Sequence, residues 1–360
     1  MISFLVPQKD HALEDTCYTF VISALPFAAG RLYIGNSYPV QKKKLERELV
    51  SSVTEQFLVQ LKRADWMDAV SKRLATAKLK NMVQNVAYPS WIMSDADLDQ
   101  FYEGLSESIL PDDNFMICLQ KINAFDETKA FAKLLLAPDR TDFYASPATV
   151  NAWYIPFYNS ITIPAAILNP DIFDDDFPMA TNYGAAGFVV GHEITHGFDN
   201  MGIQFFENGY LDTWMSKQSQ RRFANRAQCF IDQYQKFCYP QVNNTCINGQ
   251  MTLGENLSDN GGLKTAFYAY QRYAAFQDGK HEHIPGFSDY SMNQIFFLSF
   301  AHTFCTSISD AMLAKLLLTD VHSPAEARVI GTLKNFEEFG IAFGCKIGQP
   351  MRPLKRCSIW

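Results

Sequence analysis

Two histidines and a glutamate lie close together in residues 192–196, which have the sequence HEITH. If this segment is helical, His192 and His196 are one turn apart on the same face, and both imidazoles can bind one metal ion. Glu193 would face the same cavity and could take a proton from a zinc-bound water, whose pKa the metal lowers toward about 7. The pattern predicts a zinc site for hydrolysis, and a chance occurrence is the alternative.

Two histidines leave a catalytic zinc ion one protein ligand short, because such sites use three protein ligands and keep a fourth position open. Residues 253–262, with the sequence LGENLSDNGG, contain Glu255 and Asp259 four residues apart. One carboxylate can reach the metal while the other orients a histidine, and we expect Glu255 to be the ligand. The alternative for this segment is an acidic helix start followed by a glycine turn.

Three further residues could support such a site. Asp199 follows His196 by three residues and could accept its second ring N–H, although a surface aspartate fits this spacing as well. His322 could donate a hydrogen bond to an oxyanion, and Arg328 could hold a carbonyl or a carboxylate. The alternative for this last segment is an ordinary helix start, because Ser323-Pro324 follows the histidine.

Composition and charge limit the other functions. The chain has 360 residues, of which 48% are hydrophobic and 14% aromatic, so it can bury a large core in one or two domains. Its formal net charge of -7 provides no basic field for phosphates, and we expect no nucleic-acid partner. The run Lys42-Lys43-Lys44 is expected to be a solvated helix face. No apolar stretch reaches about 20 residues, so no transmembrane segment is predicted, and residues 295–304 are expected to form a buried helix.

The apolar periodicity predicts helices over residues 40–63, 65–80, 95–108, 184–197, 214–237, 255–277, 290–318 and 324–338. Residues 149–163 are rich in β-branched and aromatic residues and contain prolines, which is typical of edge strands. A proline-containing break after residue 110 predicts a boundary near residue 112. The expected fold class is mainly α with a small β-sheet.

Eight cysteines without a CxxC pair favour an oxidising compartment and disulfide bonds. The first seven residues, MISFLVP, lack a basic region and have too short an apolar core for a signal peptide. No secretion signal is therefore predicted from this chain.

Taken together, these motifs closely resemble the neprilysin and endothelin-converting-enzyme family of zinc metalloendopeptidases. The similarity is carried by residues 151–154 (NAWY), 191–199 (GHEITHGFD), 254–262 (GENLSDNGG), 319–324 (TDVHSP) with Arg328, and 357–360 (CSIW). The motifs follow the family's order over residues 150–360, and weaker similarity extends back to residue 29.

The resemblance implies a thermolysin-like catalytic domain at residues 113–360 and a remnant of a helical covering domain at residues 1–112. It implies one zinc ion per chain and hydrolysis of peptide substrates on the amino side of hydrophobic residues. The ligands would be His192, His196 and Glu255. It also implies an extracellular or cell-surface location.

The resemblance assigns roles to the surrounding residues as well. Asp199 and Asp259 would orient the zinc histidines. Asp259 would also be one of the catalytic residues. His322 and Arg328 would stabilise the transition state and hold the substrate.

Substrate recognition is assigned to a strand edge and an apolar pocket. Asn151 and Ala152 would bind the substrate backbone as a strand added to an edge. The residue after the cleaved bond would enter a pocket formed by Ile167, Ile172, Phe188 and Val189. The alternative for Phe188 and Val189 is that they only pack their helix.

The cysteines show where this chain departs from the family. The resemblance implies the disulfides Cys229–Cys357 and Cys238–Cys246. Family chains are about twice as long and begin with a cytoplasmic tail, a membrane-spanning helix and the first half of the ectodomain. Cysteines whose partners would lie in that part are Cys17, Cys305 and Cys345. Cys118 has no obvious partner.

Unpaired thiols and an incomplete covering domain predict lower stability and a more open site. Around Cys305, the sequence TFCTSIS also lacks the Trp and Arg-Pro-Glu of the family. The leading hypothesis is a zinc metalloendopeptidase. The alternatives are a truncated, catalytically silent relative that binds zinc and peptides, and a fragment that does not accumulate as a folded protein.

Overall fold

The computed structural model describes residues 12–38, 40–276 and 284–360. The chain divides into two compact units, each assembled from three stretches. The first consists of Met1–Lys43, Val83–Ala152 and Thr162–Ile167, and the second of Lys44–Met82, Trp153–Ile161 and Leu168–Trp360. The boundary predicted near residue 112, between a covering and a catalytic domain, remains a prediction.

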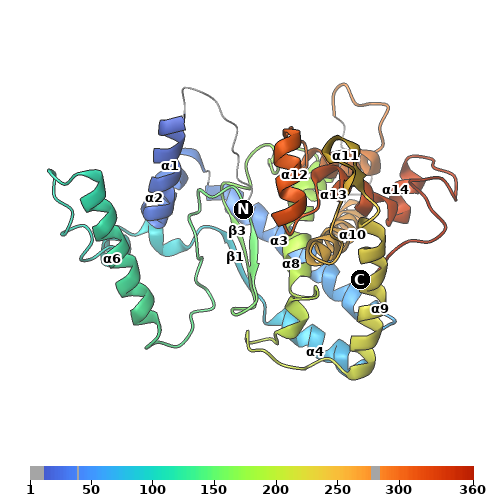
Figure 1. The fold of residues 1–360 in the computed structure, drawn as a ribbon, viewed down its shortest axis with the longest axis horizontal. Helices are drawn as coiled ribbons and strands as arrows, with labels where there is room; N and C mark the ends of the chain where they lie inside the picture. The colour runs from blue at the N-terminus through green and yellow to red at the C-terminus, as the bar shows by residue number, and fades with distance from the viewer. Residues whose placement is uncertain (1–11, 39, 277–283) are drawn as a thin grey trace. The chain divides into compact units, whose positions relative to one another are not determined.

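Helices dominate the first unit (Figure 1). Its elements are α1 (Ala12–Ala24), α2 (Pro26–Ser37), β1 (Val83–Ala87), the 3-10 turn η1 (Ser90–Met93), α5 (Asp95–Phe101) and α6 (Phe115–Lys133). The Asn114 side chain accepts a hydrogen bond from Ile117 N at 3.1 Å and so caps the start of α6. The Tyr102 hydroxyl accepts from Phe27 N and Ala28 N at 3.1 and 3.3 Å, which satisfies two free amides at the start of α2.

The prediction that Lys42-Lys43-Lys44 forms a solvated face is wrong for the first two lysines. Lys42 and Lys43 are buried. Lys43 donates from Nζ to Tyr88 O at 2.8 Å and lies 3.6 Å from the centroid of the Tyr88 ring. A hydrogen bond and a cation–π contact together compensate for the loss of water around the ammonium group. Lys44 is exposed, 3.9 Å from Glu48 Oε1.

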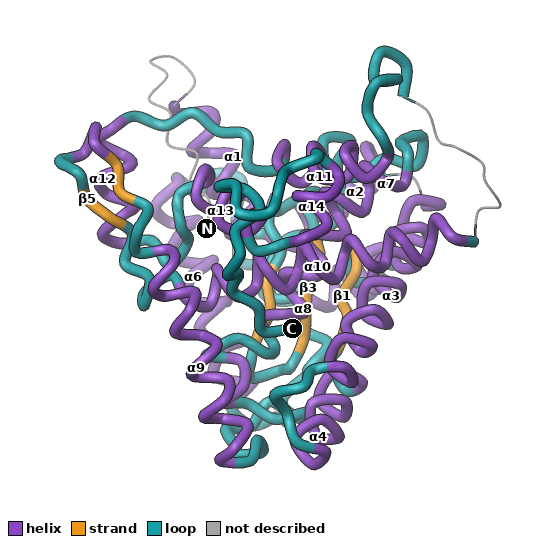
Figure 2. The backbone as a smooth tube through the Cα atoms, turned by 90° about the vertical axis from the view of Figure 1, so that its right-hand side faces the viewer, coloured by secondary structure: helices purple, strands orange, loops and turns teal. Residues whose placement is uncertain are grey.

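The second unit is also mainly helical (Figure 2), and two of its helices carry residues 192–196 and 254–262. Its long helices are α3 (Val40–Arg63), which begins in the first unit, α4 (Ala69–Lys80), α9 (Lys217–Tyr234) and α10 (Leu253–Ala275). Its other helices are α7 (Met179–Asn182), α8 (Phe188–His196), α11 (Met292–His302), α12 (Asp310–Thr319), α13 (Ala325–Lys334) and α14 (Glu337–Ala342). Short turns are the π-helical η2 (Tyr183–Gly187) and the 3-10 turns η3 (Gly202–Gln204) and η4 (Pro240–Val242).

Strands are few and short in the described residues. β1, β3 (Ser160–Pro164) and β2 (Trp153–Ile155) form a three-stranded sheet in the order β1-β3-β2, and β3 is divided between the two units. The prediction of edge strands over residues 149–163 is therefore wrong for β3, which is the middle strand. β4 (Cys238–Tyr239) and β5 (Thr245–Cys246) pair antiparallel, with Cys238 opposite Cys246. The predicted fold class, mainly α with a small sheet, is confirmed.

The predicted single helix over residues 290–318 is wrong, because α11 ends at His302 and α12 begins at Asp310. Ser309 accounts for the second start, since its hydroxyl accepts a hydrogen bond from Met312 N at 3.2 Å as an N-cap. The predicted helix over 324–338 is likewise two helices, α13 and α14. Neither α6 nor β1 was predicted as an element.

The buried helix predicted over residues 295–304 corresponds to α11, whose buried residues are Ile295, Phe296, Phe297 and Phe300. Within the described ranges, no helix by itself has the length and apolar character needed to cross a membrane. The segments Asp15–Ala24 and Pro26–Asn36, bent by 110°, meet the same criteria of length and composition only as a pair.

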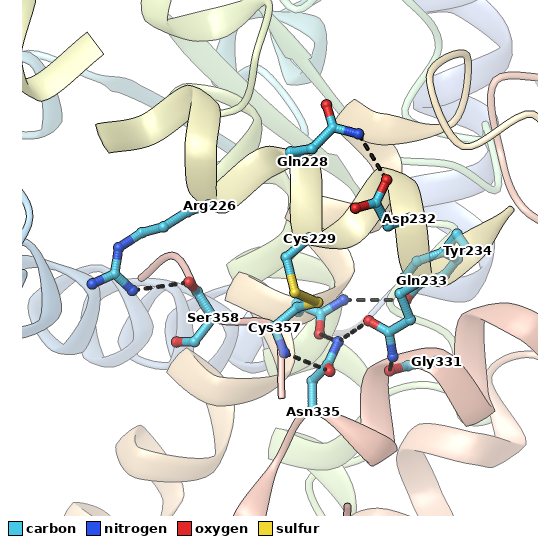
Figure 3. Close-up of a disulfide and its surroundings, with 11 residues drawn as sticks. Arg226, Gln228, Cys229, Asp232, Gln233, Tyr234, Gly331, Asn335, Cys357 and Ser358 are labelled. Carbon is cyan, nitrogen blue, oxygen red and sulfur yellow. Dashed lines mark hydrogen bonds between the residues drawn. A yellow bond between two sulfur atoms is a disulfide. The ribbon is translucent and has the colours of Figure 1, made fainter. Parts of the chain in front are cut away.

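Both disulfides implied by the resemblance are present, Cys229–Cys357 and Cys238–Cys246. Figure 3 shows Asn335 beside the first of them. The Asn335 side chain donates to Gln233 Oε1 at 2.8 Å and accepts from Cys357 N at 3.0 Å. The C-terminal segment is therefore fixed to α9 both covalently and by hydrogen bonds. The cysteines outside these bonds are Cys17, Cys118, Cys305 and Cys345.

The last residue of this segment, Trp360, belongs to an aromatic cluster in the second unit. The ring of Trp360 lies 5.2 to 6.3 Å from the rings of Phe57, Trp66, Phe198 and Phe223. Aromatic pairs at such separations add stability beyond their buried area. Because Phe198 follows α8 by two residues, this cluster helps to fix the end of the helix that carries the HEITH motif.

Candidate metal centre

The helices that carry the two chemical motifs cross at their backbones. Figure 1 and Figure 2 both show α8 beside α10. A Cβ atom on Gly191 would lie 2.8 Å from Gly262 O, and one on Gly262 would lie 2.6 Å from His192 N. These separations leave no room for any side chain at either glycine. The glycines therefore permit an approach that brings HEITH against GENLSD.

We expect Gly262→Ala to weaken both folding and zinc binding, because its methyl group would meet backbone atoms that cannot rotate away. Overpacking of this kind costs about 1–3 kcal/mol. Thermal unfolding of the metal-free protein and zinc titration measure the two effects. Gly35→Ala on α2 is the matched control, since nothing lies within 4 Å of the Cβ it would add. Equal stability of the Gly262 and Gly35 variants would contradict the steric argument.

The predicted ligands converge at this crossing. His192, His196 and Glu255 each offer one ligand atom, and these atoms lie within 4.8 Å of one another. The Nε2 atoms of the two histidines are 3.0 Å apart. Glu255 Oε2 lies 3.2 Å from His192 Nε2, and its Oε1 lies 3.5 Å from His196 Nε2. Side chains from two helices thus surround one point.

The contacts of the second ring nitrogen of each histidine show whether the ligand atoms at that point suit a cation. His192 Nδ1 lies 2.9 Å from Asp259 Oδ1, and His196 Nδ1 lies 2.7 Å from Asp199 Oδ2. Since a carboxylate only accepts hydrogen bonds, each neutral imidazole keeps its proton on Nδ1 and presents a lone pair at Nε2. Two lone pairs 3.0 Å apart, with a carboxylate beside them, repel one another unless a cation lies among them. The donor set fits zinc, and these residues form a zinc-binding site.

The charges of the site are strongly coupled. Burial disfavours the charged form of His196, but the Glu255 and Asp199 carboxylates outweigh it and raise the histidine pKa well above its ordinary value. Burial also acts to raise the pKa of Glu255, yet the neighbouring histidines hold that pKa well below its usual range. Because imidazole binds a metal only when neutral, zinc uptake should release a proton here.

Glu193 belongs to the same helix but not to the ligand set. Its side chain is buried, and burial raises its pKa, while His192 and His196 act in the opposite direction. His322 is among the charged groups that act on it. A buried carboxylate next to the ligands, and not one of them, is available for proton transfer.

Asp259 is held by Arg328. The guanidinium donates from Nε to Asp259 Oδ2 at 2.8 Å and from Nη2 to Oδ1 at 2.6 Å. Asp259 is fully buried, and Arg328 lowers its pKa against the effect of burial. The bidentate geometry fixes the carboxylate that orients His192. Arg328 lies 4.7 Å from the centroid of the Phe304 ring and 4.0 Å from Glu255 Oε2.

His322 also lies at the site, with Nε2 3.1 Å from Glu255 Oε2. Its orientation depends on Asp320, which was not among the predicted site residues. Asp320 Oδ1 lies 2.8 Å from His322 Nδ1 and accepts from His322 N at 2.9 Å. Ser258, whose Oγ lies 3.1 Å from His196 Nδ1, was missed as well. The sequence signal for Asp320 was its position, since an acidic residue two positions before a histidine can contact the ring nitrogen.

The residues expected to form the apolar pocket are not all in one unit. Ile172 and Val189 are half-buried in the second unit, and Phe188 is buried there. The ring of Phe188 lies 4.7 and 5.5 Å from the rings of Phe300 and Phe304.

Ile167, Asn151 and Ala152 belong to the first unit. Ile167 is half-buried, and the Asn151 side chain accepts a hydrogen bond from Ala152 N at 2.9 Å. The assignment of these three residues to substrate binding remains a prediction.

Comparison with known proteins identifies the family of this chain. A model of peptidase family M13 matches residues 151–359, more than half of the chain, and a second model of the same family matches residues 5–89. The chain belongs to peptidase family M13. The matched region includes every residue of the M13 metal centre described above, and it confirms the resemblance found in the sequence.

Similar M13 sequences include Neprilysin-11 of Caenorhabditis elegans, 38% identical over 344 residues, and human neprilysin, 36% identical over 345 residues. Mouse membrane metallo-endopeptidase-like 1 is 38% identical over 346 residues. Each alignment covers 96% of this chain but only 40% to 45% of the relative. The chain therefore spans less than half the length of these relatives.

Solved structures agree with the M13 fold. The Mycobacterium tuberculosis zinc metalloprotease Zmp1, in complex with an inhibitor, matches with a TM-score of 0.80 and 30% identity over 95% of this chain and 50% of its own. The Haemonchus galactose-containing glycoprotein complex matches with a TM-score of 0.85 and 30% identity, covering 97% of this chain and 56% of that one.

Proposed function

We propose that this chain is a zinc metalloendopeptidase that hydrolyses peptides on the amino side of hydrophobic residues. One observation carries the proposal. The ligand atoms of His192, His196 and Glu255 lie within 4.8 Å of one another, and Glu193 is buried beside them. Membership of a peptidase family supports the same reaction class.

The chemistry is divided between the metal and the side chains. A zinc ion at this site supplies positive charge that acidifies water and polarises a peptide carbonyl. Glu193 accepts the proton that water loses as its oxygen adds to the carbonyl carbon, and then delivers that proton to the leaving amine nitrogen. Burial raises the pKa of Glu193, which favours acceptance of a proton by its carboxylate.

Further side chains are assigned to the transition state. His322 is proposed to donate a hydrogen bond from Nε2 to the developing oxyanion, with Asp320 Oδ1 lying 2.8 Å from its Nδ1. Arg328 has an additional nitrogen, Nη1, beyond the two that bind Asp259, and this donor is proposed to hold a substrate carbonyl.

Substrate selection is proposed to combine backbone and apolar recognition. Asn151 and Ala152 would take up the substrate backbone as an added strand. The residue after the cleaved bond would contact a pocket of Ile167, Ile172, Phe188 and Val189. All four side chains are apolar, which supports a preference for a hydrophobic residue in the substrate.

An extracellular or cell-surface location belongs to the same proposal. The two disulfides support it, because such bonds persist in oxidising compartments. One similar protein is named membrane metallo-endopeptidase-like 1, and by analogy this chain would meet peptides outside the cell.

The test uses the chain of residues 1–360. We expect about one zinc ion per chain and cleavage of a quenched peptide immediately before its single phenylalanine, with the position of the cut identified by mass spectrometry. The same peptide with aspartate in place of phenylalanine is the control, and a chelator should abolish cleavage. Bound zinc without cleavage would favour the silent relative. Cleavage that survives complete removal of metal would overturn the proposal.

A further inference from the structure

Lys78 is a fully buried lysine in α4, outside the metal centre. Its Nζ donates to two backbone oxygens, Gly202 O at 2.5 Å and Phe205 O at 2.6 Å. The rings of Phe198 and Tyr154 lie 5.5 and 5.8 Å from Nζ. A buried ammonium group is costly unless hydrogen bonds and nearby charge compensate it, so full burial of a lysine requires an explanation.

Lys78 has enough N–H donors for its two carbonyl partners in either protonation state. Burial lowers the pKa of Lys78 to about 7, and the charge of Asp199 acts in the opposite direction. An ammonium group has three N–H donors and a neutral amine has two. Both forms can therefore satisfy the carbonyls of Gly202 and Phe205.

The segment that Lys78 holds is the one that positions Asp199. Met201 N and Gly202 N donate to Asp199 Oδ1 at 2.7 and 2.6 Å. Asp199 Oδ2 in turn lies 2.7 Å from His196 Nδ1. The peptide units on either side of the Gly202 Cα thus bond to Lys78 on one side and to Asp199 on the other. A continuous series of hydrogen bonds connects α4 to a metal ligand.

This segment also returns very close to the end of α8. A Cβ atom on Gly202 would lie only 1.9 Å from His196 O, so the turn is built against the ligand's own backbone. The other end of the series is anchored, because Asp68 caps α4 by accepting from Ser71 N at 2.8 Å and also accepts from Ser219 Oγ on α9 at 3.1 Å. The helix that carries Lys78 is therefore held in place at its start.

We propose that Lys78 is a positioning residue for the zinc site: by holding the carbonyls of Gly202 and Phe205, it keeps Asp199 in place to orient His196. The proposal concerns metal binding and holds whether or not the chain cleaves peptides. Its outcome is therefore independent of the proposed function. Partners that orient a ligand typically change metal affinity by about 10–100-fold when they are removed.

The test is Lys78→Met, which keeps an unbranched side chain only one atom shorter and removes its donors. We expect zinc affinity, measured by competition with a chromogenic chelator, to fall by about tenfold. The visible spectrum of the cobalt-loaded protein should also shift, because it reports ligand geometry. Lys72→Met is the matched control on the same helix. Lys72 is only partly buried and donates to Lys62 O at 3.1 Å, and its loss should leave both readouts unchanged.

Two further comparisons separate positioning from folding. If Lys78 acts through Asp199, Lys78→Met should weaken zinc binding much less in an Asp199→Asn background than in the original chain. If Lys78→Met does not fold, Lys78→Gln retains a donor on a shorter chain and should show a smaller but measurable loss of zinc affinity. A variant that melts at a lower temperature but keeps its zinc affinity within twofold and its cobalt spectrum overturns the proposal.

Discussion

Glu193→Gln should retain zinc and lose cleavage by about 10³-fold, within the range for loss of a general acid–base group. Glutamine has nearly the same shape as glutamate, but its amide cannot take a proton from water at neutral pH. Because Glu193 is not one of the three converging ligands, the metal site should stay intact. Zinc content and cleavage of the quenched peptide, measured on the same preparation, check both halves of this expectation.

Glu48→Gln provides the control for the loss of one carboxylate. Glu48 is exposed on α3, and its carboxylate lies 3.9 Å from Nζ of Lys44, which is not one of the ligands. Its substitution should change neither zinc content nor cleavage. If Glu193→Gln loses its zinc, then Glu193 supports the metal directly and the assignment of general base is wrong.

Glu255→Ala should weaken zinc binding by more than about 100-fold, which exceeds the usual loss from removing a partner that only orients a ligand. The substitution removes the single carboxylate among the three ligands and leaves two imidazoles from the same helix. Isothermal titration with zinc, or competition with a chelator of known affinity, measures the loss. Cleavage should fall with the amount of bound metal.

Asp259→Asn, one turn along α10, gives the graded comparison. Asparagine can still contact His192 and Arg328, but it no longer carries the charge that makes both contacts strong. We expect a smaller loss of zinc affinity, about tenfold to 100-fold. Should the Asp259 variant lose more zinc affinity than the Glu255 variant, the two carboxylates would have to exchange roles.

The ligands could be predicted from the sequence because their chemistry is local. Histidines four residues apart on a helix share a face, and Glu255 and Asp259 repeat this spacing on a second helix. The helix periodicity placed α3 correctly and both motif helices nearly so. Each of these inferences needs only residues within one or two turns of one another.

Other features depend on contacts between distant segments. Lys43 is buried because Tyr88 accepts its hydrogen bond, and nothing in a run of three lysines indicates that partner. Lys78 is buried by a turn more than a hundred residues later in the chain. The crossing of α8 and α10 depends on Gly191 meeting Gly262, whereas a glycine in sequence indicates only freedom of the backbone.

The misplaced elements have a simpler cause. Apolar residues continue through the break between α11 and α12, so periodicity joined two helices that Ser309 separates by capping the second. α6 was missed because it has little amphipathic character, and its middle and end expose residues such as Phe131. A periodic pattern predicts a helix only where one face is buried.

The crossing of α8 and α10 at two glycines indicates which positions near the centre should tolerate substitution. The spacing of the three ligands depends on the closest approach of two main chains, at which neither Gly191 nor Gly262 has room for a side chain. We therefore expect residues around the centre that do not contact this crossing to tolerate substitution better than the two glycines do.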